Sequence, residues 1–181
     1  AEEAVREGAG HLVLTDEHQG PDRIPMPMIL ATSAVHSWLI RQGLRTFCSL
    51  SVRSAECLDP HYFAVLIGVG ATTVNAYLAQ ETIADRHQRG LFGNRPLDEC
   101  VRRYVEAVNA GLLKIMSKMG ISVLNSYQGA QIFEAVGIGE ELIDRCFSGT
   151  PSQIGGIGFK EVARESLQRH RAAYEGPLPE D

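Results

Sequence analysis

Residues 114–138 read KIMSKMGISVLNSYQGAQIFEAVGI, and the interpretation of the fold starts from this stretch. A helical pattern of apolar residues runs into Gly120, and glycine is a typical helix end. The apolar run 121–124 then predicts a short strand, and residues 128–136 predict a second helix. A strand followed directly by a helix is the repeating unit of parallel α/β folds.

Polar residues gather around the end of this predicted strand. Lys118 supplies a charge, Ser122, Asn125 and Ser126 supply hydrogen-bonding groups, and Met119 offers a polarisable surface. Parallel α/β proteins bind ligands at such strand ends, where the next helix directs its positive end. The stretch therefore predicts a site for an electron-rich aromatic cofactor. The alternative is ordinary packing, with the methionines in the core and Lys118 at a solvated helix end.

The most regular helical pattern of the chain lies just before this site. Apolar residues recur every three or four positions from residue 97 to residue 119, which predicts one long helix. Pro96 stands where a first-turn proline is favoured. The stretch 89–96 concentrates glycine and proline, so we predict a domain boundary there, with domains at 1–90 and 91–181.

Three strand–helix units are expected before this boundary. Strands are predicted at 11–17, 46–52 and 72–76, and helices at 28–43, 58–70 and 77–88. The first strand is expected to be buried, and Asp59 and Pro60 form a capping pair for the second helix. The alternation predicts a parallel sheet with helices packed on it.

Two more helices are expected after residue 138. They are predicted at 139–147 and 160–174, with a flexible loop at 148–159 between them. The loop contains GGIG at 155–158, which lacks the glycine spacing and the preceding strand of a phosphate-binding loop.

Composition and charge exclude several function classes. The 181 residues carry 17 Lys+Arg against 22 Asp+Glu, a net charge of -5, which argues against nucleic-acid binding. No apolar run is long enough to span a membrane, so a cytoplasmic protein is expected. The start, AEEAVREGAG, is acidic and lacks Met, which predicts a segment of a longer protein rather than a signal peptide.

The candidate nucleophiles and metal ligands form no catalytic pattern. Cys48, Cys57, Cys100 and Cys146 are widely spaced, so reduced thiols, mostly buried, are expected and no metal site. No HExxH or GxSxG motif occurs, and His36 is interpreted as a hydrogen-bonded core residue. No catalytic residue is predicted.

The stretch GLLKIMSKMGISVLNSYQGAQIFEAVGIGEELIDRCFSGTPSQIGGIGF resembles a segment of glutamate synthase large subunits. Earlier stretches, such as RIPMPMILATSAVHSWLIRQGLRT and HYFAVLIGVGATTVNAYLAQET, resemble the end of that family's central domain. The resemblance covers nearly the whole chain. It implies α/β architecture, with parallel βα units from the central domain at 1–90 followed by the first part of a (β/α)8 FMN barrel at 91–181.

The resemblance also implies an activity. The family makes L-glutamate from 2-oxoglutarate and glutamine-derived ammonia, and reduced FMN supplies the hydride. Electrons reach FMN through an iron–sulfur cluster whose ligands would lie outside this segment. The expected partners are the remaining domains of the polypeptide and, as electron source, a small NAD(P)H-oxidising subunit or ferredoxin. The segment alone is expected to be inactive and to bind FMN very weakly.

The resemblance places the expected FMN contacts at the strand end. Asn125 and Ser126 are favoured over Lys118, Met119, Gly120 and Ser122 because barrel ligands sit at carboxyl strand ends. The sequence departs from the family in having Asn125 where glutamine is usual, and Gln128 and Gln153 where arginine is usual. The last two differences remove positive charge from the vicinity of an anionic ligand.

Two other interpretations stay open from the sequence. One is a non-catalytic α/β scaffold or subunit-contact module derived from the same family. The other is a free-standing small-ligand binder of doubly wound type, which predicts one continuous sheet. The glutamate synthase interpretation instead predicts two separate packing units.

Overall fold

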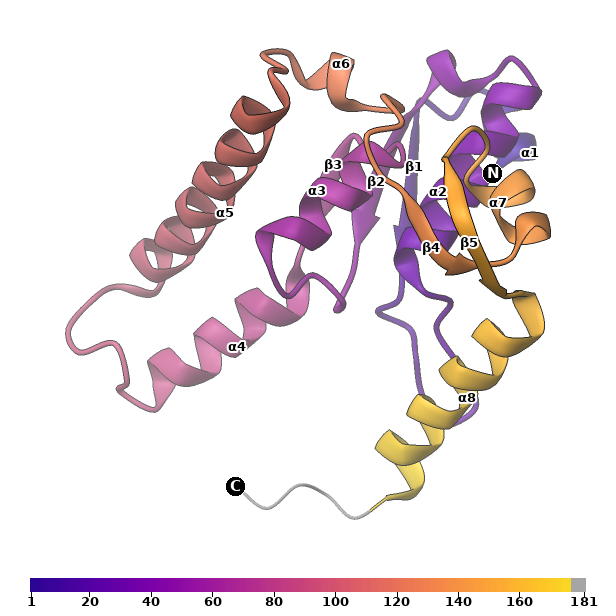
Figure 1. The fold of residues 1–181 in the computed structure, drawn as a ribbon. Coiled ribbons are helices and arrows are strands. Elements are labelled where there is room, and N and C mark those ends of the chain that lie inside the picture. Colours follow the sequence, from indigo (N-terminus) through magenta and orange to yellow (C-terminus); the bar gives the residue numbers. More distant parts are fainter. Residues whose placement is uncertain (177–181) are drawn as a thin grey trace.

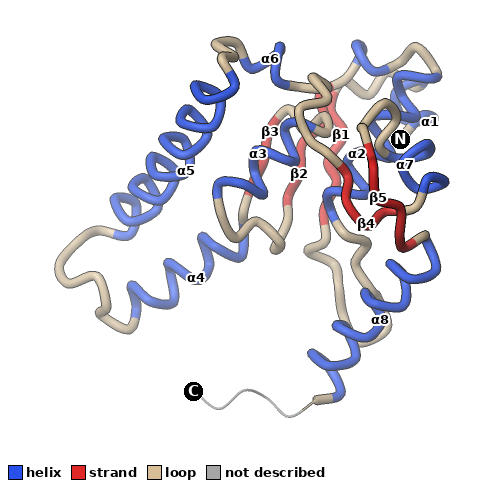
Figure 2. Tube along the Cα trace, in the orientation of Figure 1, coloured by secondary structure: helices blue, strands red, loops and turns tan. Residues whose placement is uncertain are grey.

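The computed structural model describes residues 1–176, in which helices and parallel strands alternate along the chain (Figure 1). The strands form two separate sheets, one of three strands and one of two (Figure 2). Within each sheet the neighbouring strands are parallel. The predicted fold class, mixed α/β with parallel βα units, is confirmed.

The first sheet consists of three consecutive strand–helix units. Its strands are β1 (His11–Thr15), β2 (Ser49–Arg53) and β3 (Thr73–Asn75), in that spatial order. The helices after them are α2 (Met28–Arg41), α3 (Pro60–Gly68) and α4 (Tyr77–Gln88). The short helix α1 (Glu2–Arg6) precedes β1, and the 3₁₀ turn η1 (Arg45–Phe47) precedes β2. All six predicted elements are therefore present.

This sheet buries one face only. Leu50 and Val52 of β2 are buried, whereas Ser49 and Ser51 alternate with them on the other face. Val13 of β1 is 62% exposed and no residue of this strand is buried, so the prediction of a buried strand is wrong. The helices α2 and α3 cover the apolar face, and a sheet covered on one side needs alternating residues rather than a continuous apolar run.

The helix α5 (Leu97–Met119) confirms the long helix predicted from the apolar pattern. Pro96 is its N-cap rather than its first helical residue. The helix packs against α3 and α4, and Gly111 permits the close approach to α3, since a Cβ there would lie 2.7 Å from the Cβ of Pro60. In Figure 1, α5 stands beside α3 on the side away from β4 and β5.

The region after α5 departs from the prediction in two places. It contains α6 (Leu124–Tyr127), β4 (Ala135–Ile138), α7 (Glu140–Cys146), β5 (Ser152–Ile157) and α8 (Phe159–Glu175). The helix predicted at 128–136 is wrong, because Gly129 and Gln131 have φ of 68° and 53°, which no right-handed helix contains. The flexible loop predicted at 148–159 is also wrong, because β5 lies within it and pairs with β4. The helices predicted at 139–147 and 160–174 are confirmed as α7 and α8.

Glycine explains why β5 was not recognised as a strand. Gly156 of β5 passes so close to β4 that a Cβ there would overlap the carbonyl group of Gly137. Glycine inside a strand commonly marks such an approach of two backbones, but in a sequence it resembles a loop. The order β4, α7, β5, α8 is again a repeat of strand and helix. Its assignment to the start of an eight-stranded barrel stays a prediction.

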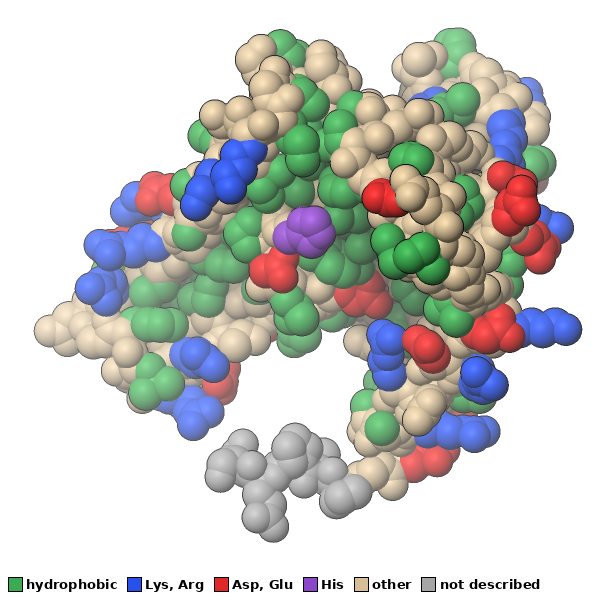
Figure 3. Space-filling model, viewed as in Figure 1, with side chains coloured by type: hydrophobic (Ala, Val, Ile, Leu, Met, Phe, Trp, Pro, Cys, Tyr) green, Lys and Arg blue, Asp and Glu red, His purple; other side chains and the backbone are tan. Residues whose placement is uncertain are grey.

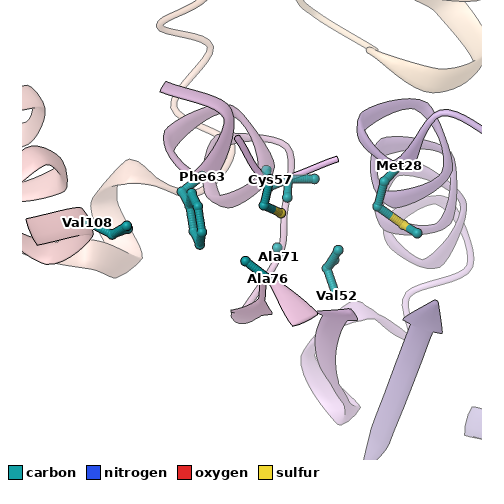
Figure 4. Close-up of a cluster of buried hydrophobic side chains, with 8 residues drawn as sticks. Met28, Val52, Cys57, Phe63, Ala71, Ala76 and Val108 are labelled. Carbon is teal, nitrogen blue, oxygen red and sulfur yellow. The ribbon is translucent and has the colours of Figure 1, made fainter. Parts of the chain in front are cut away.

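The hydrophobic core joins residues from both sides of the predicted boundary. The largest cluster holds Met28 of α2, Val52 of β2, Phe63 of α3 and Val108 of α5 (Figure 4). A second cluster packs Leu30 of α2 against α7. The two sheets rule out the single continuous sheet expected for a doubly wound binder within residues 1–176. The shared clusters show that these sheets do not pack as separate units, while the domain division at residue 90 stays a prediction.

No helix within residues 1–176 is both long enough and apolar enough to cross a membrane.

Candidate functional site

The predicted cofactor residues surround the end of α5. Lys118 and Met119 form its last turn, and Gly120 ends it in the left-handed conformation with φ of 69°. The N–H of Ile121 donates to the carbonyl of Met116 at 3.0 Å, which is the bond of a Schellman cap. The cap turns the chain away from the helix axis and toward α6.

The strand predicted at 121–124 is wrong. Leu124 begins α6, and the N–H of Ser126 donates to the carbonyl of Val123 at 3.0 Å, so the backbone turns instead of extending. Ile121 and Tyr127 anchor this turn in the cluster around Ala64 and Ile67, whereas Val123 is 56% exposed. A four-residue apolar run does not decide between strand and helix, and within residues 1–176 this run pairs with no strand.

The six predicted residues are therefore not at a strand end. Asn125 and Ser126 lie exposed on α6, and Lys118, Met119 and Gly120 are exposed at the end of α5. Ser122 lines a cavity of about 590 Å³ between α5 and β3, whose walls include Val108 and Leu112. No charged side chain lines that cavity.

These residues fit FMN only as a partial wall. A bound flavin needs a concave surface that buries most of the ring system, whereas all six residues are exposed. The helix α6 has four residues, too few for its N-terminus to hold a phosphate group. The described chain by itself does not enclose FMN, and we derive no reaction step from it.

The cysteines do not fit an iron–sulfur cluster. Cys48, Cys57 and Cys146 are buried in different clusters, and Cys100 is half-buried. Burial, with the nearby carboxylates of Asp16 and Glu56, raises the pKa of Cys57 to about 12, so it stays a thiol. Residues 1–176 contain no group of three or more His, Cys, Asp or Glu side chains arranged to hold a metal. The prediction of buried, reduced thiols agrees with this arrangement.

A cluster of polar side chains closes the carboxyl ends of the first sheet. Asp16 follows β1, is 7% exposed, and accepts hydrogen bonds from the Ser54 hydroxyl at 2.7 Å and the Ala55 N–H at 3.0 Å. Arg53 donates to both carboxylate oxygens of Glu17, at 2.6 and 2.7 Å, and to Asn75 at 3.1 Å. We call these five side chains (Asp16, Glu17, Arg53, Ser54 and Asn75) the strand-end cluster. Its charged groups pair with one another.

A second cavity, which we call the α2–β4 cavity, was not predicted from the sequence. It has a volume of about 500 Å³ and lies among α2, α3 and the segment 129–150. Its apolar walls come from Ile29, Ile40, Val65, Val69, Phe133, Ile138 and Phe147. Figure 3 shows hydrophobic side chains gathered at the centre of this face of the molecule, between α5 and the β4–β5 pair.

His36 is the best-defined polar group of the α2–β4 cavity. Its Nδ1 accepts a hydrogen bond from Arg45 Nε at 2.9 Å, and Arg45 also donates to the carbonyls of Cys48 and Gly70. Burial and the Arg45 charge lower the pKa of His36 to about 4. A neutral ring whose Nδ1 accepts must carry its proton on Nε2. A Cβ at Gly70 would overlap the ring, which fixes the ring's position.

Arg41 stands at the rim of the same cavity. Its guanidinium donates to the carbonyl of Asp144 and to the Ser148 hydroxyl at 2.7 Å, linking α2 to α7. Ser37 and Ser33, one and two turns earlier on α2, donate their hydroxyl protons to the carbonyl of Cys146. The spacing of four between Ser33, Ser37 and Arg41 is a sequence signal for one polar helix face. No comparable signal marks Gln131 or Thr150, which reach the cavity through the irregular segment.

Comparisons with known proteins agree on one family. The sequence profile of the glutamate synthase central domain matches residues 1–139. The large chain of an NADPH glutamate synthase from Azospirillum brasilense is 59% identical over 173 residues, covering 96% of this chain and 11% of that protein. The corresponding large chain from Bacillus subtilis (strain 168) is 47% identical, covering 97% of this chain and 11% of the relative.

A plant relative has a different electron donor in its name. Ferredoxin-dependent glutamate synthase 1 from Arabidopsis thaliana is 44% identical over 178 residues, covering 92% of this chain and 11% of that protein. The chain thus spans 11% of the length of these three relatives.

Proposed function

The chain belongs to the glutamate synthase family, and on that premise we propose that it is a segment of an enzyme forming L-glutamate. The proposed substrates of the whole polypeptide are 2-oxoglutarate and ammonia released from L-glutamine. FMN would supply the hydride, and an iron–sulfur cluster outside this chain would supply electrons. The observation that carries the proposal is the 59% identity over 96% of the chain.

The proposed role of this chain within the enzyme is to position surfaces for the other domains. The side chains of Asn125 and Ser126 are exposed on α6 and project from the body of the chain. Exposed hydrogen-bonding groups on a short helix contribute to a binding site only when a facing surface completes it. Their proposed role is therefore one wall of an FMN site that other domains complete.

An experiment on the whole polypeptide tests this role. Replacing Asn125 and Ser126 with alanine should lower the FMN content of the purified polypeptide and its rate of glutamate formation. Ser117→Ala, exposed on α5 before the cap, is the matched control and should change neither. Unchanged FMN content in the double variant would show that α6 does not contribute to the FMN site.

A scaffold without a direct ligand contact is the second candidate. It is favoured by the exposure of all six predicted site residues and by the absence of an enclosed site around them in residues 1–176. The two candidates differ in the same experiment. A scaffold predicts that the double alanine variant keeps both its FMN and its rate.

Membership of the family leaves more than one electron donor open. The relatives named above include NADPH-dependent and ferredoxin-dependent enzymes. The higher identity to the bacterial large chains favours NADPH for the proposed enzyme. Comparing glutamate formation with NADPH and with reduced ferredoxin on the whole polypeptide, with its small subunit where one exists, distinguishes the donors.

A further inference from the structure

The α2–β4 cavity has the size and walls of a small-molecule site. Its volume of about 500 Å³ lies within the range of roughly 300–1,000 Å³ that ligand pockets occupy. Its walls are mostly apolar and include Val65 of α3, Val69 at the end of α3, and Phe133 from the segment before β4. Such a cavity favours a ligand with a flat apolar body.

His36 presents a hydrogen-bond donor whose position is fixed by its partner Arg45. His36 cannot accept through Nδ1, which is occupied by Arg45, so it presents an N–H at Nε2. That nitrogen faces Gly129, where a Cβ would lie 3.9 Å from it. The hydroxyl protons of Ser33 and Ser37 are already given to the carbonyl of Cys146. The ring of His36 therefore supplies a fixed donor for an acceptor atom of the ligand.

Two arginines lie at or beside the cavity, Arg41 at its rim and Arg45 behind His36. Arg41 and Arg45 donate to carbonyl oxygens, a hydroxyl and a ring nitrogen, and neither forms a salt bridge with a carboxylate within residues 1–176. Glu134, exposed at the rim, is the acidic side chain among the lining residues, and His61 is the other titratable one besides His36. Both hydrogen bonds of Arg41 come from Nη2, so its Nε and Nη1 have no partner within residues 1–176 and can receive one carboxylate.

We propose that the α2–β4 cavity binds an aromatic monocarboxylate that carries a hydrogen-bond acceptor on its ring. The carboxylate pairs with Arg41 at the rim, and the ring lies against the apolar wall to which Val65, Val69 and Phe133 contribute. The acceptor on the ring receives the N–H of His36. This site is separate from α6 and is independent of the proposed FMN contacts.

The experiment compares three probes that differ in one group each. The 181-residue chain is titrated with 4-hydroxyphenylacetate, phenylacetate and 4-hydroxyphenylethylamine, and binding is followed by isothermal calorimetry. The first probe should bind most tightly and phenylacetate several-fold more weakly, because it lacks the acceptor for His36. The amine should not saturate the site, because its charge is repelled by Arg41.

Variants of the chain identify the groups that bind. Arg41→Gln should weaken 4-hydroxyphenylacetate by about tenfold or more, because a charge-assisted hydrogen bond is lost. Arg41→Lys should retain part of the affinity, and Arg102→Gln, a matched change on the exposed face of α5, should retain all of it. Circular dichroism of each variant shows whether it is folded.

Three results would overturn the proposal. The first is no saturable binding of 4-hydroxyphenylacetate by the folded chain at millimolar concentration. The second is equal affinity for the acid and the amine, and the third is unchanged affinity in folded Arg41→Gln.

Discussion

The strand-end cluster and the α2–β4 cavity both combine arginine with buried polar groups, yet they differ in where the hydrogen bonds go. In the strand-end cluster Arg53 meets the carboxylate of Glu17, and Asp16 meets two donors of the next strand. Beside the cavity Arg41 and Arg45 meet only neutral acceptors, and the Nε2 donor of His36, which faces Gly129, has no hydrogen-bond partner within residues 1–176. The first arrangement stabilises the sheet, whereas the second leaves binding capacity for a ligand.

This difference runs against a common expectation for α/β proteins. Ligands usually bind outside the carboxyl ends of parallel strands. Here Asp16 and Arg53 at those ends are hydrogen-bonded to neighbouring groups, and the strand order is sequential, so the sheet offers no crevice where the order reverses. The unused donors lie instead beside α2, on the helical layer.

The largest expected effect comes from breaking the strand-end cluster. Asp16→Ala leaves the hydroxyl of Ser54 and the N–H of Ala55 buried without an acceptor, and should lower the free energy of unfolding by about 3 kcal/mol. Asp22→Ala, in an exposed loop, should change it by less than about 0.5 kcal/mol. Urea denaturation at pH 7 measures both, and an equal response of the two variants would contradict the role assigned to Asp16.

An intermediate effect is expected from the titration of His36. Its folded pKa of about 4 lies below the unfolded value of about 6.5, so the unfolded chain binds the proton first as pH falls. The contribution of His36 to the free energy of unfolding, fully present above pH 6.5, should therefore be lost between pH 6.5 and pH 4. This residue should cause no further loss below pH 4. Because the ring is partly solvated, we expect the free energy of unfolding to fall by about 2 kcal/mol, which is less than the full pKa shift would give.

His36→Asn is the variant that isolates this titration. The Asn side chain keeps an acceptor near Arg45 but does not titrate in this window. The free energy of unfolding, measured at pH 7 and at pH 4, should fall less in the variant than in the parent chain. Parallel losses in the two proteins would show that His36 is charged in the folded state.

The smallest expected effect concerns a hydrogen-bond donor, the Tyr127 hydroxyl, that has no partner in the described part of the chain and lines no cavity described above. The hydroxyl of Tyr127 is buried without a hydrogen-bond partner within residues 1–176, but the residue lines neither of the two cavities described. Tyr127→Phe should therefore stabilise the fold by up to about 1 kcal/mol, since the ring contact with Phe133 is kept. Thermal denaturation measures it, with the exposed Tyr174→Phe as control. A loss of stability would mean that the hydroxyl is satisfied.

The sequence predicts the elements whose signals are local. The long apolar pattern ending at Gly120 identifies α5, and the Asp59–Pro60 pair identifies the start of α3, where Asp59 accepts the N–H of Tyr62 at 2.9 Å. The strand β5 was missed because its glycines serve a close backbone contact with β4 that the sequence does not display. The helix wrongly expected at 128–136 fails at Gln131, a non-glycine residue in the left-handed region.

The candidate sites depend on long-range contacts and were harder to predict. The six residues around the end of α5 were chosen because a strand was expected at 121–124, and that strand is absent. His36 was correctly expected to be hydrogen-bonded, but its partner Arg45 and its neighbour Gly129 come from other elements. Only the folded chain brings these groups to one cavity.

The protonation state of His36 in solution tests most directly the difference between the strand-end cluster, whose hydrogen bonds are satisfied, and the α2–β4 cavity, which keeps a donor for a ligand. A long-range proton–nitrogen NMR spectrum of the folded chain at pH 5.5 reports which ring nitrogen carries the proton. The structure predicts a neutral ring protonated at Nε2 and unprotonated at Nδ1, bonded to Arg45. A doubly protonated ring at that pH, or a proton on Nδ1, would contradict the account of an open donor in the α2–β4 cavity.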